Sequence, residues 1–113
     1  MQDIQAKLRF LPLSPQKVRL VIDLIRGKDV NEALEMLRFV QKRSAQPVRK
    51  LLASAVSNAE ENFGISRDDL YIATIFADEA PTRRWRRFGA RGRFKPILRR
   101  TSHVTVVLRE RSA

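Results

Sequence analysis

The spacing of apolar residues divides the chain into extended and helical segments. Over residues 5–13 apolar and polar residues alternate loosely, which predicts a first strand that Pro12 ends. In this strand Ala6, Leu8 and Phe10 are expected to share one face. Residues 70–77 and 101–108 are rich in β-branched and aromatic residues, which predicts two further strands. The chain is therefore expected to begin and end in sheet.

Three segments between the first two predicted strands have the period of a helix. Ser14 is a suitable N-cap for the first, Pro15 suits its first helical position, and Gly27 ends it. Asp29 is expected to cap a second, short helix, with Glu32 placed to complete a capping box. These two helices follow the first strand without a long connection.

The third helical segment is the longest. Ser44 is expected to cap it, apolar residues recur with a period of 3.6 as far as Phe63, and Gly64 ends it. The order of strand, helices and then strands predicts an α+β fold. At 113 residues the chain is expected to form a single domain, residues 1–113.

Positive charge is concentrated in residues 81–100, which contain nine Arg or Lys and no acid. The chain has 23 basic and 12 acidic residues, so outside this segment 14 basic residues face 12 acidic ones. A block of like charge repels itself and needs an external polyanion to become ordered. Trp85, Phe88 and Phe94 lie among the arginines, and aromatic rings stack on bases. Nucleic acid is the partner that this pattern favours.

The basic segment lies between two predicted strands, which favours a protruding β-hairpin at about residues 80–101. Gly89 and Gly92 predict the position of its turn. Arms of about nine residues reach on the order of 30 Å at ~3.3 Å per residue. Pro96 cannot donate a ladder hydrogen bond, so we expect a bulge or an outward-facing edge there.

Composition excludes several classes of protein. The chain has no cysteine, so it forms neither a disulfide nor a cysteine zinc site. Its apolar runs are far shorter than the ~20 residues that span a bilayer. Residues 1–10 have neither signal-peptide nor transit-peptide character. We therefore expect a cytoplasmic protein without a membrane partner, and the lack of transit character favours a bacterial over an organellar source.

The sequence has no enzyme signature, and we expect neither a metal nor another cofactor. His103 is the only histidine, and it cannot pair with Ser102 as base and nucleophile because adjacent strand residues point to opposite faces. Two rival functions remain open at this point. One is an architectural DNA-bending protein that uses Trp85 or Pro96 as a wedge, and the other is a metal-independent nuclease that uses His103.

Basic residues also cluster outside the hairpin. Each cluster alone is equally compatible with ordinary surface charge and with binding. Lys42 and Arg43 precede a helix N-terminus, whose free N–H groups also attract phosphate, which favours binding there. The clustered residues are Lys17, Arg19 and Arg26 on the first helix and Lys42, Arg43, Arg49 and Lys50 around the start of the third.

With its segments assembled, the chain resembles the family of large-subunit ribosomal protein L twenty-two. The matching runs are SPQKVRLVIDLIRGK at 14–28, SAVSNAEEN at 54–62, DEAP at 78–81, ARGR at 90–93 and RTSHVTVVL at 100–108. Their order and spacing hold over nearly the whole chain, which makes the resemblance specific.

The resemblance implies three helices packed on a small antiparallel sheet, with a long protruding hairpin. It implies a structural, non-enzymatic constituent of the large ribosomal subunit that binds large-subunit rRNA, supports subunit assembly and lines the nascent-peptide exit tunnel. Implied partners are neighbouring ribosomal proteins and the nascent polypeptide, with the chain a monomer within the ribosome.

Resemblance and residue pattern together give two sets of candidate site residues. We expect the tip of the hairpin to face the tunnel, with Phe88, Gly89, Ala90, Arg91, Gly92 and Arg93. The residues predicted to bind rRNA are Ser14, Lys17, Arg19, Lys42, Arg43, Arg83, Arg84, Trp85, Arg86, Arg87, Arg91, Arg93, Lys95, Arg99, Arg100, Thr101, Ser102 and His103.

Overall fold

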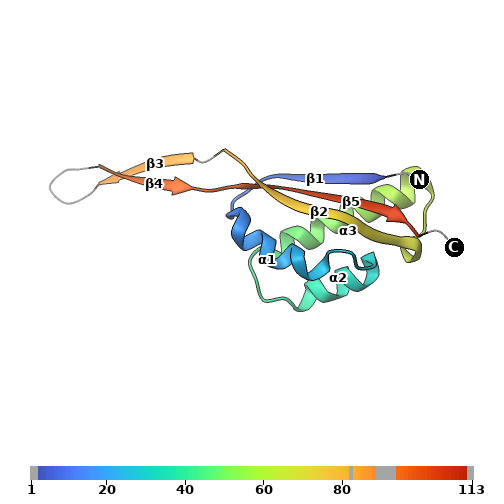
Figure 1. Ribbon diagram of the computed structural model, residues 1–113. Helices are drawn as coiled ribbons and strands as arrows, with labels where there is room; N and C mark the ends of the chain where they lie inside the picture. Colours follow the sequence, from blue (N-terminus) through green and yellow to red (C-terminus); the bar gives the residue numbers. More distant parts are fainter. Residues whose placement is uncertain (1–2, 82, 89–93, 112–113) are drawn as a thin grey trace.

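Three helices pack on one face of a three-stranded antiparallel sheet, and a two-stranded ribbon projects from one end (Figure 1). The computed structural model describes residues 3–81, 83–88 and 94–111, with side chains for 3–81 and 100–111. The predicted α+β fold is confirmed. The elements are β1 (Ile4–Leu11), α1 (Pro15–Ile25), α2 (Val30–Phe39), α3 (Ala45–Phe63), a 3-10 turn (Arg67–Asp69), β2 (Leu70–Glu79), β3 (Arg83–Phe88), β4 (Phe94–Arg99) and β5 (Ser102–Glu110).

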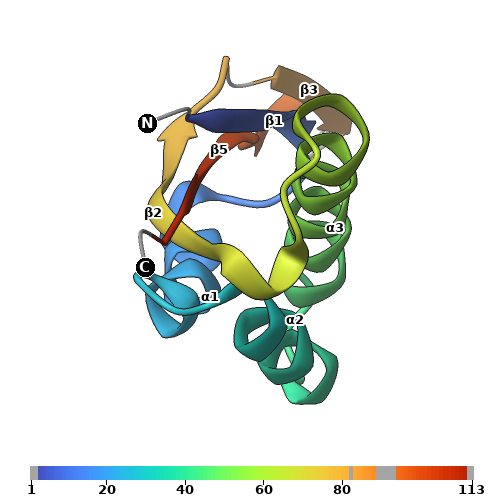
Figure 2. The same cartoon turned by 90° about the vertical axis from the view of Figure 1, so that its right-hand side faces the viewer.

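The sheet has the strand order β1-β5-β2, so the last strand lies between the first two. Val104, Val106 and Leu108 of β5 are fully buried, and they face the helices. Successive strand residues point to opposite faces, so His103, Thr105 and Val107 point away from the helices. Figure 2 shows the helices gathered on one side of the curved sheet. In the part of the chain that the structure describes, no helix covers the other side, which we call the outer face.

A bulge near the end of β1 changes which residues face the core. The pairing of β1 with β5 shifts between Leu8, opposite Val104, and Leu11, opposite Ser102. Phe10 in this bulge has a φ of 57°, in the left-handed region. The extra residue reverses the alternation, so Leu11 is buried while Phe10 is 52% exposed. The prediction that Phe10 shares a face with Ala6 and Leu8 is therefore wrong.

The helices begin where the sequence predicts, but the predicted capping bonds are not made. Within residues 3–81, the side chains of Ser14, Asp29 and Ser44 form no cap hydrogen bond. Asp29 Oδ1 instead accepts a hydrogen bond from Arg111 Nε at 2.6 Å. The capping box is wrong as well, since Glu32 pairs with Lys28 at 3.7 Å.

The ribbon that projects from the sheet is the predicted hairpin. β3 pairs with β4 from Arg83, opposite Arg99, to Phe88, opposite Phe94. Pro96 lies opposite Arg86 in an unbroken register, so the described strands contain no bulge there. The other predicted possibility, that Pro96 lies on an outward-facing edge, stays a prediction. The predicted turn falls on residues 89–93, outside the described residues. The molecule measures 67 × 26 × 18 Å, and the ribbon lies along its long axis (Figure 1).

Candidate nucleic-acid interface

The hairpin strands place positive residues directly opposite one another. Arg83 of β3 lies opposite Arg99 of β4, and Arg87 lies opposite Lys95. Like charges at opposite positions of an antiparallel pair destabilise it, and a two-stranded hairpin is at best marginally stable in water. This arrangement favours binding of an external polyanion. The described strands also include Arg84, Trp85, Arg86 and Phe88, whereas Gly89, Ala90, Arg91, Gly92 and Arg93 lie outside the described residues.

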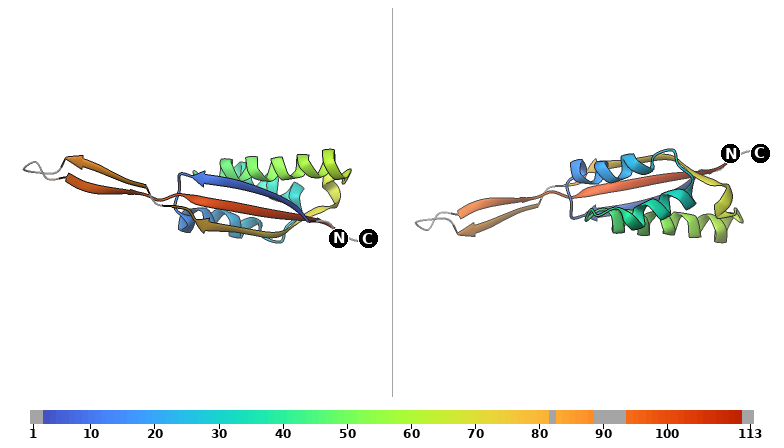
Figure 3. Two further views of the ribbon diagram at one scale, coloured as in Figure 1. Left: turned by 90° about the horizontal axis from the view of Figure 1, so that it is seen from above. Right: turned by 90° about the horizontal axis from the view of Figure 1, so that it is seen from below.

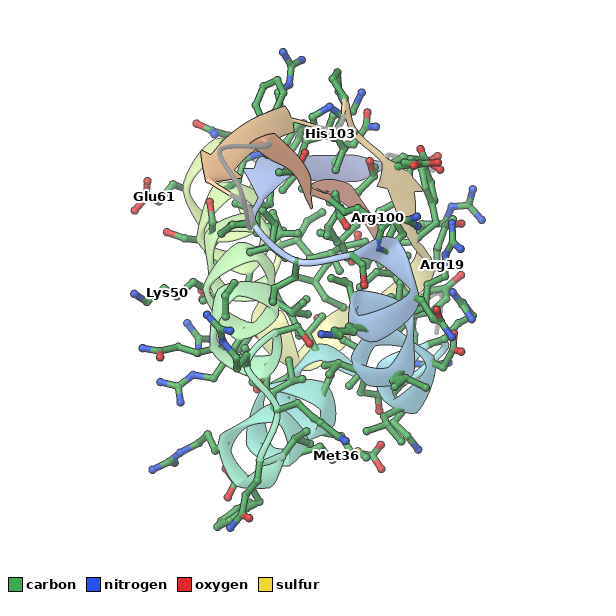
Figure 4. All side chains as sticks on the ribbon, turned by 90° about the vertical axis from the view of Figure 1, so that its left-hand side faces the viewer. Arg19, Met36, Lys50, Glu61, Arg100 and His103 are labelled. Atoms are coloured by element: carbon green, nitrogen blue, oxygen red, sulfur yellow. The ribbon has the colours of Figure 1, made fainter. Side chains whose placement is uncertain are left out.

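Where the hairpin leaves the sheet, the structure brings three predicted site residues together. Ser14, Arg19 and Arg100 line a groove of about 520 Å³ together with Pro15, Gln16 and Glu79. Figure 4 looks along the molecule from the hairpin end and shows Arg19 and Arg100 near each other. The carboxylate of Glu79 is the acid among these lining residues.

Arg19 is also held by the sheet. Its Nε and Nη2 donate to the carbonyl oxygen of Ala77 at 3.2 and 2.8 Å, and Arg26 Nη2 donates to the carbonyl oxygen of Ile75 at 2.8 Å. Ala77 and Ile75 belong to β2, an edge strand whose outward carbonyls would otherwise be open to another strand. Arg19 in α1 and Arg26 at its C-terminal cap lie seven residues apart, and together they cover that edge. Lys17 is exposed, and RNA contact by Lys17 or Arg19 stays a prediction.

The hydroxyl groups of Thr101 and Ser102 hold the root of the hairpin. Thr101 Oγ1 donates to the carbonyl oxygen of Pro81 at 3.2 Å, and the N–H of Ala80 donates to the carbonyl oxygen of Thr101 at 3.0 Å. Ser102 Oγ donates to the carbonyl oxygen of Leu13 at 2.6 Å. Both residues are buried. Their described contacts are internal to the protein, and their predicted RNA contacts stay predictions.

His103 lies on the outer face and is bonded to the β1 bulge. Its Nδ1 accepts a hydrogen bond from the N–H of Phe10 at 3.1 Å, and the two rings meet edge to face with centroids 4.7 Å apart. Accepting at Nδ1 requires the neutral imidazole with its proton on Nε2. The hydroxyl of Ser102 is bonded on the opposite face of the sheet, so the two side chains form no nucleophile–base pair.

Two adjoining grooves beside the start of α3 collect further cations. One, of about 530 Å³, lies between β1 and α3, and the other, of about 500 Å³, lies where α2 meets α3; Arg43 and Gln46 line both. Among the described residues that line them there is no acid. Figure 4 shows Lys50 projecting from α3 away from the domain. The lining cations are Lys7, Arg38, Lys42, Arg43, Arg49 and Lys50.

Sequence reasoning identified only part of this surface. It gave Lys42 and Arg43 as candidate binders and noted Arg49 and Lys50 beside them. It missed Lys7 and Arg38, which come from β1 and the last turn of α2. A lysine on the polar side of an alternating strand is the signal that could have indicated Lys7, but only the packing of β1 beside α3 joins it to Arg43.

Other kinds of site receive no support from the described residues. Nowhere in residues 3–81, 83–88 or 94–111 do three acidic or histidine side chains form a group that could hold a metal ion. Within the same ranges, none of the helices is both long and apolar enough to cross a bilayer.

Comparison with known proteins identifies relatives over nearly the whole chain. A family model described as ribosomal protein L22p/L17e matches residues 6–109. The large ribosomal subunit protein uL22 of Caldicellulosiruptor saccharolyticus is 54% identical over 106 residues, which cover 94% of this chain and 87% of that protein. The proteins of the same name from Thermoanaerobacter sp. and Thermoanaerobacter pseudethanolicus are each 49% identical over 109 residues, which cover 96% of this chain and 98% of theirs.

Proposed function

This chain belongs to the ribosomal protein L22p/L17e family, and we propose that, as a structural constituent of the large ribosomal subunit, it binds large-subunit rRNA. The hairpin provides the main contact, and the cationic grooves beside α3 provide a second. Its place of action is the ribosome in the cytoplasm, with rRNA and neighbouring ribosomal proteins as partners. The chain acts there as a single rRNA-binding domain and as a monomer, and it performs no catalysis.

One observation carries the proposal: the hairpin strands place like charges opposite each other. Arg83 opposite Arg99 and Arg87 opposite Lys95 repel in the free protein. Phosphates placed around the ribbon remove this repulsion and release condensed counterions. Arginine forks bind phosphate with two hydrogen bonds and stack on bases, which lysine cannot do. Binding therefore orders the hairpin at the same time as it fixes the surrounding RNA.

The elongated shape of the molecule supports different RNA contacts for the domain and for the hairpin. A hairpin that projects along the 67 Å long axis reaches RNA segments far from those that contact the domain. Joining separate rRNA domains in this way supports subunit assembly. With the domain outside, the tip at residues 88–93 lines the nascent-peptide exit tunnel and faces the polypeptide in transit. The residues assigned to rRNA contact are those predicted from the sequence, together with the further cations of the grooves beside α3.

The DNA-bending alternative is a weaker candidate. Architectural proteins with basic β-arms generally pair through an apolar face, and relatives that match 94–96% of this chain are named as ribosomal proteins. The DNA-bending alternative would be favoured again if the free chain bound duplex DNA and structured RNA with equal affinity and sedimented as a dimer.

Photocrosslinking in assembled large subunits tests the proposed function. A photoreactive phenylalanine analogue replaces Trp85 in β3, and the matched control replaces Phe63, an exposed aromatic residue at the end of α3. We expect the variant at position 85 to crosslink to large-subunit rRNA and the variant at position 63 to do so far less. Subunits that incorporate the chain but give no rRNA adduct at position 85 would contradict the hairpin contact. A chain that stays out of the subunit would contradict the proposed function altogether.

A further inference from the structure

The outer face of the sheet presents aromatic rings to solvent. Phe76 of β2 is 39% exposed and Phe10 of β1 is 52% exposed. The register places Phe76 and Lys7 on either side of Thr105 in the central strand. Seen from above in Figure 3, β1, β5 and β2 lie in front of the helices, so the outer face is open. Apolar residues that are exposed singly are ordinary on a protein surface, so the case for a ligand at these rings depends on the backbone and the polar groups around them.

The backbone at Phe10 is strained in a way that orients its ring outward. A φ of 57° is unfavourable for a bulky residue other than glycine. Burial offsets this cost only in part, because Phe10 as a residue is 52% exposed. Instead, the strained N–H is fixed on His103 Nδ1 at 3.1 Å and the ring rests edge-on against the imidazole. Strained backbone conformations that the surrounding structure maintains cluster at functional sites.

The polar groups around these rings suit a phosphodiester chain. Lys7 and Arg9 of β1 are exposed. Lys7 lies at the edge between this face and the groove beside α3, which it also lines, and Arg9 shares the bulge with Phe10 opposite His103. With Nδ1 occupied, His103 retains Nε2–H as a donor. Two acids lie on this face: Asp3 is paired with Arg109 at 2.6 Å, and Asp78 lies opposite His103. Cations therefore outnumber the acids on the outer face. In addition, β2 and β5 lead from this face directly into the basic hairpin (Figure 3).

We propose that the outer face of the sheet binds unpaired rRNA nucleotides, with bases stacked on Phe10 and Phe76 and phosphates held by Lys7 and Arg9. Open sheets with exposed aromatic rings stack bases in this manner, and stacking tolerates any sequence because every base has a π-face. His103 positions the Phe10 ring and donates from Nε2 to a base edge or a 2′-hydroxyl. The inference rests on the proposed function and adds a third contact, to single-stranded RNA rather than to phosphates alone.

A protein partner is the competing occupant, and the observed surface favours it less. The exposed rings are separated by the buried Thr105 and flanked by exposed cations. Protein interfaces bury a continuous apolar core that is depleted in charged residues, lysine among them. Separate rings interleaved with cations are the pattern of a nucleic-acid surface.

Replacing each ring with leucine tests the inference. The variants Phe10→Leu and Phe76→Leu keep apolar bulk and the Phe10 N–H but remove the planar ring. The full chain is titrated with full-length large-subunit rRNA transcript. We expect each variant to bind roughly tenfold more weakly, as for loss of one stacked base. The slope of log affinity against log salt should stay unchanged, because stacking releases no counterions. Phe10→Tyr keeps a ring and should bind like the wild type.

Phe63→Leu is the matched control. Phe63 is 42% exposed, close to the value for Phe76, but lies at the end of α3 near Glu60 and Glu61. It should bind as the wild type does. Thermal unfolding verifies that each variant folds. If Phe10→Leu does not fold, the rRNA affinity of Phe76→Leu alone tests the inference.

Each outcome separates this inference from the proposed function. A wild type that fails to bind rRNA overturns the proposed function and this inference with it. A wild type that binds, with both leucine variants within twofold of it, overturns the inference and leaves the function standing. In a third outcome, the leucine variants bind rRNA normally but are lost from subunits reconstituted with the other ribosomal proteins. That result would assign the outer face to a protein partner and would also overturn the inference.

Discussion

The domain and the hairpin of this chain are stabilised by opposite means. In the domain, fully buried residues of β5 and α3 pack together, and 14 basic residues are nearly balanced by 12 acidic ones. In the hairpin, two strands pair without a third, and Arg83 and Arg87 lie opposite other cations. The domain therefore gains its order from its own core, whereas under the proposed function the hairpin gains its order from bound rRNA. On that proposal, one chain separates the residues that fold it from the residues that bind.

The largest expected effect is on binding by the hairpin. Replacing Arg83, Arg84, Arg86 and Arg87 together with glutamine removes four cations from β3. If each contacts a phosphate, rRNA affinity at 0.1 M salt falls on the order of 10³-fold, since each contact contributes about 0.7–0.9 to the salt slope. The free energy of unfolding of the domain should not fall. Filter binding and urea unfolding measure the two quantities, and a loss of stability equal to the loss of affinity would contradict the separation.

A substitution in the core of the domain should lower stability and leave rRNA binding unchanged. Leu52 of α3 is fully buried, so Leu52→Ala is expected to lower the free energy of unfolding by about 2–5 kcal/mol. The exposed Leu20 of α1 offers the control, since Leu20→Ala should change it by less than about 0.5 kcal/mol. At a temperature where Leu52→Ala remains folded, its salt slope for rRNA should equal that of the wild type. A changed slope would show that core and hairpin are not independent.

Arg19 and Lys17 sharpen the comparison within one helix. Both are predicted to contact RNA, but Arg19 also donates two hydrogen bonds to the Ala77 carbonyl on the sheet edge. We expect Arg19→Ala to lower the free energy of unfolding by about 1 kcal/mol and to promote aggregation through the exposed edge. Lys17→Ala should leave stability unchanged and weaken rRNA binding slightly. Equal effects of the two variants on stability would contradict an edge-covering role for Arg19.

The smallest expected effect concerns a surface ion pair at the far end of the sheet. Arg109 donates to Asp3 at 2.6 Å and lowers the pKa of that carboxyl below its usual value. A depressed pKa contributes stability above the ordinary value of about 4, and this contribution is lost as the pH falls through the lower pKa of the folded protein. Asp3→Asn should therefore melt slightly below the wild type at pH 7, and the difference should vanish once the pH is below the pKa of Asp3 in the folded protein. A difference that grows toward low pH would contradict this assignment.

Local sequence was sufficient for the elements and insufficient for what their side chains contact. The period of apolar residues predicts every helix and strand of the domain, because one face of each element must be buried. The residue at the start of α2 illustrates the limit. Asp29 occupies the cap position, yet its carboxylate bonds Arg111, 82 residues away. A bond to such a distant partner cannot be read from a capping motif.

The candidate site shows the same division. The hairpin was predictable because its charge is concentrated within 20 consecutive residues. The groove that joins Lys7 to Arg43 was not, since it exists only once β1 lies beside α3. The exposure of Phe10 depends on a single extra residue in β1, and alternation alone assigns that ring to the core. Tertiary pairing, rather than residue type, decides these positions.

The central claim is that the hairpin binds rRNA by neutralising phosphates. The most direct test is the affinity of the wild-type chain for large-subunit rRNA across a series of salt concentrations. If roughly six phosphates are neutralised, the log–log slope is predicted to be on the order of −4. A slope near zero would contradict the account.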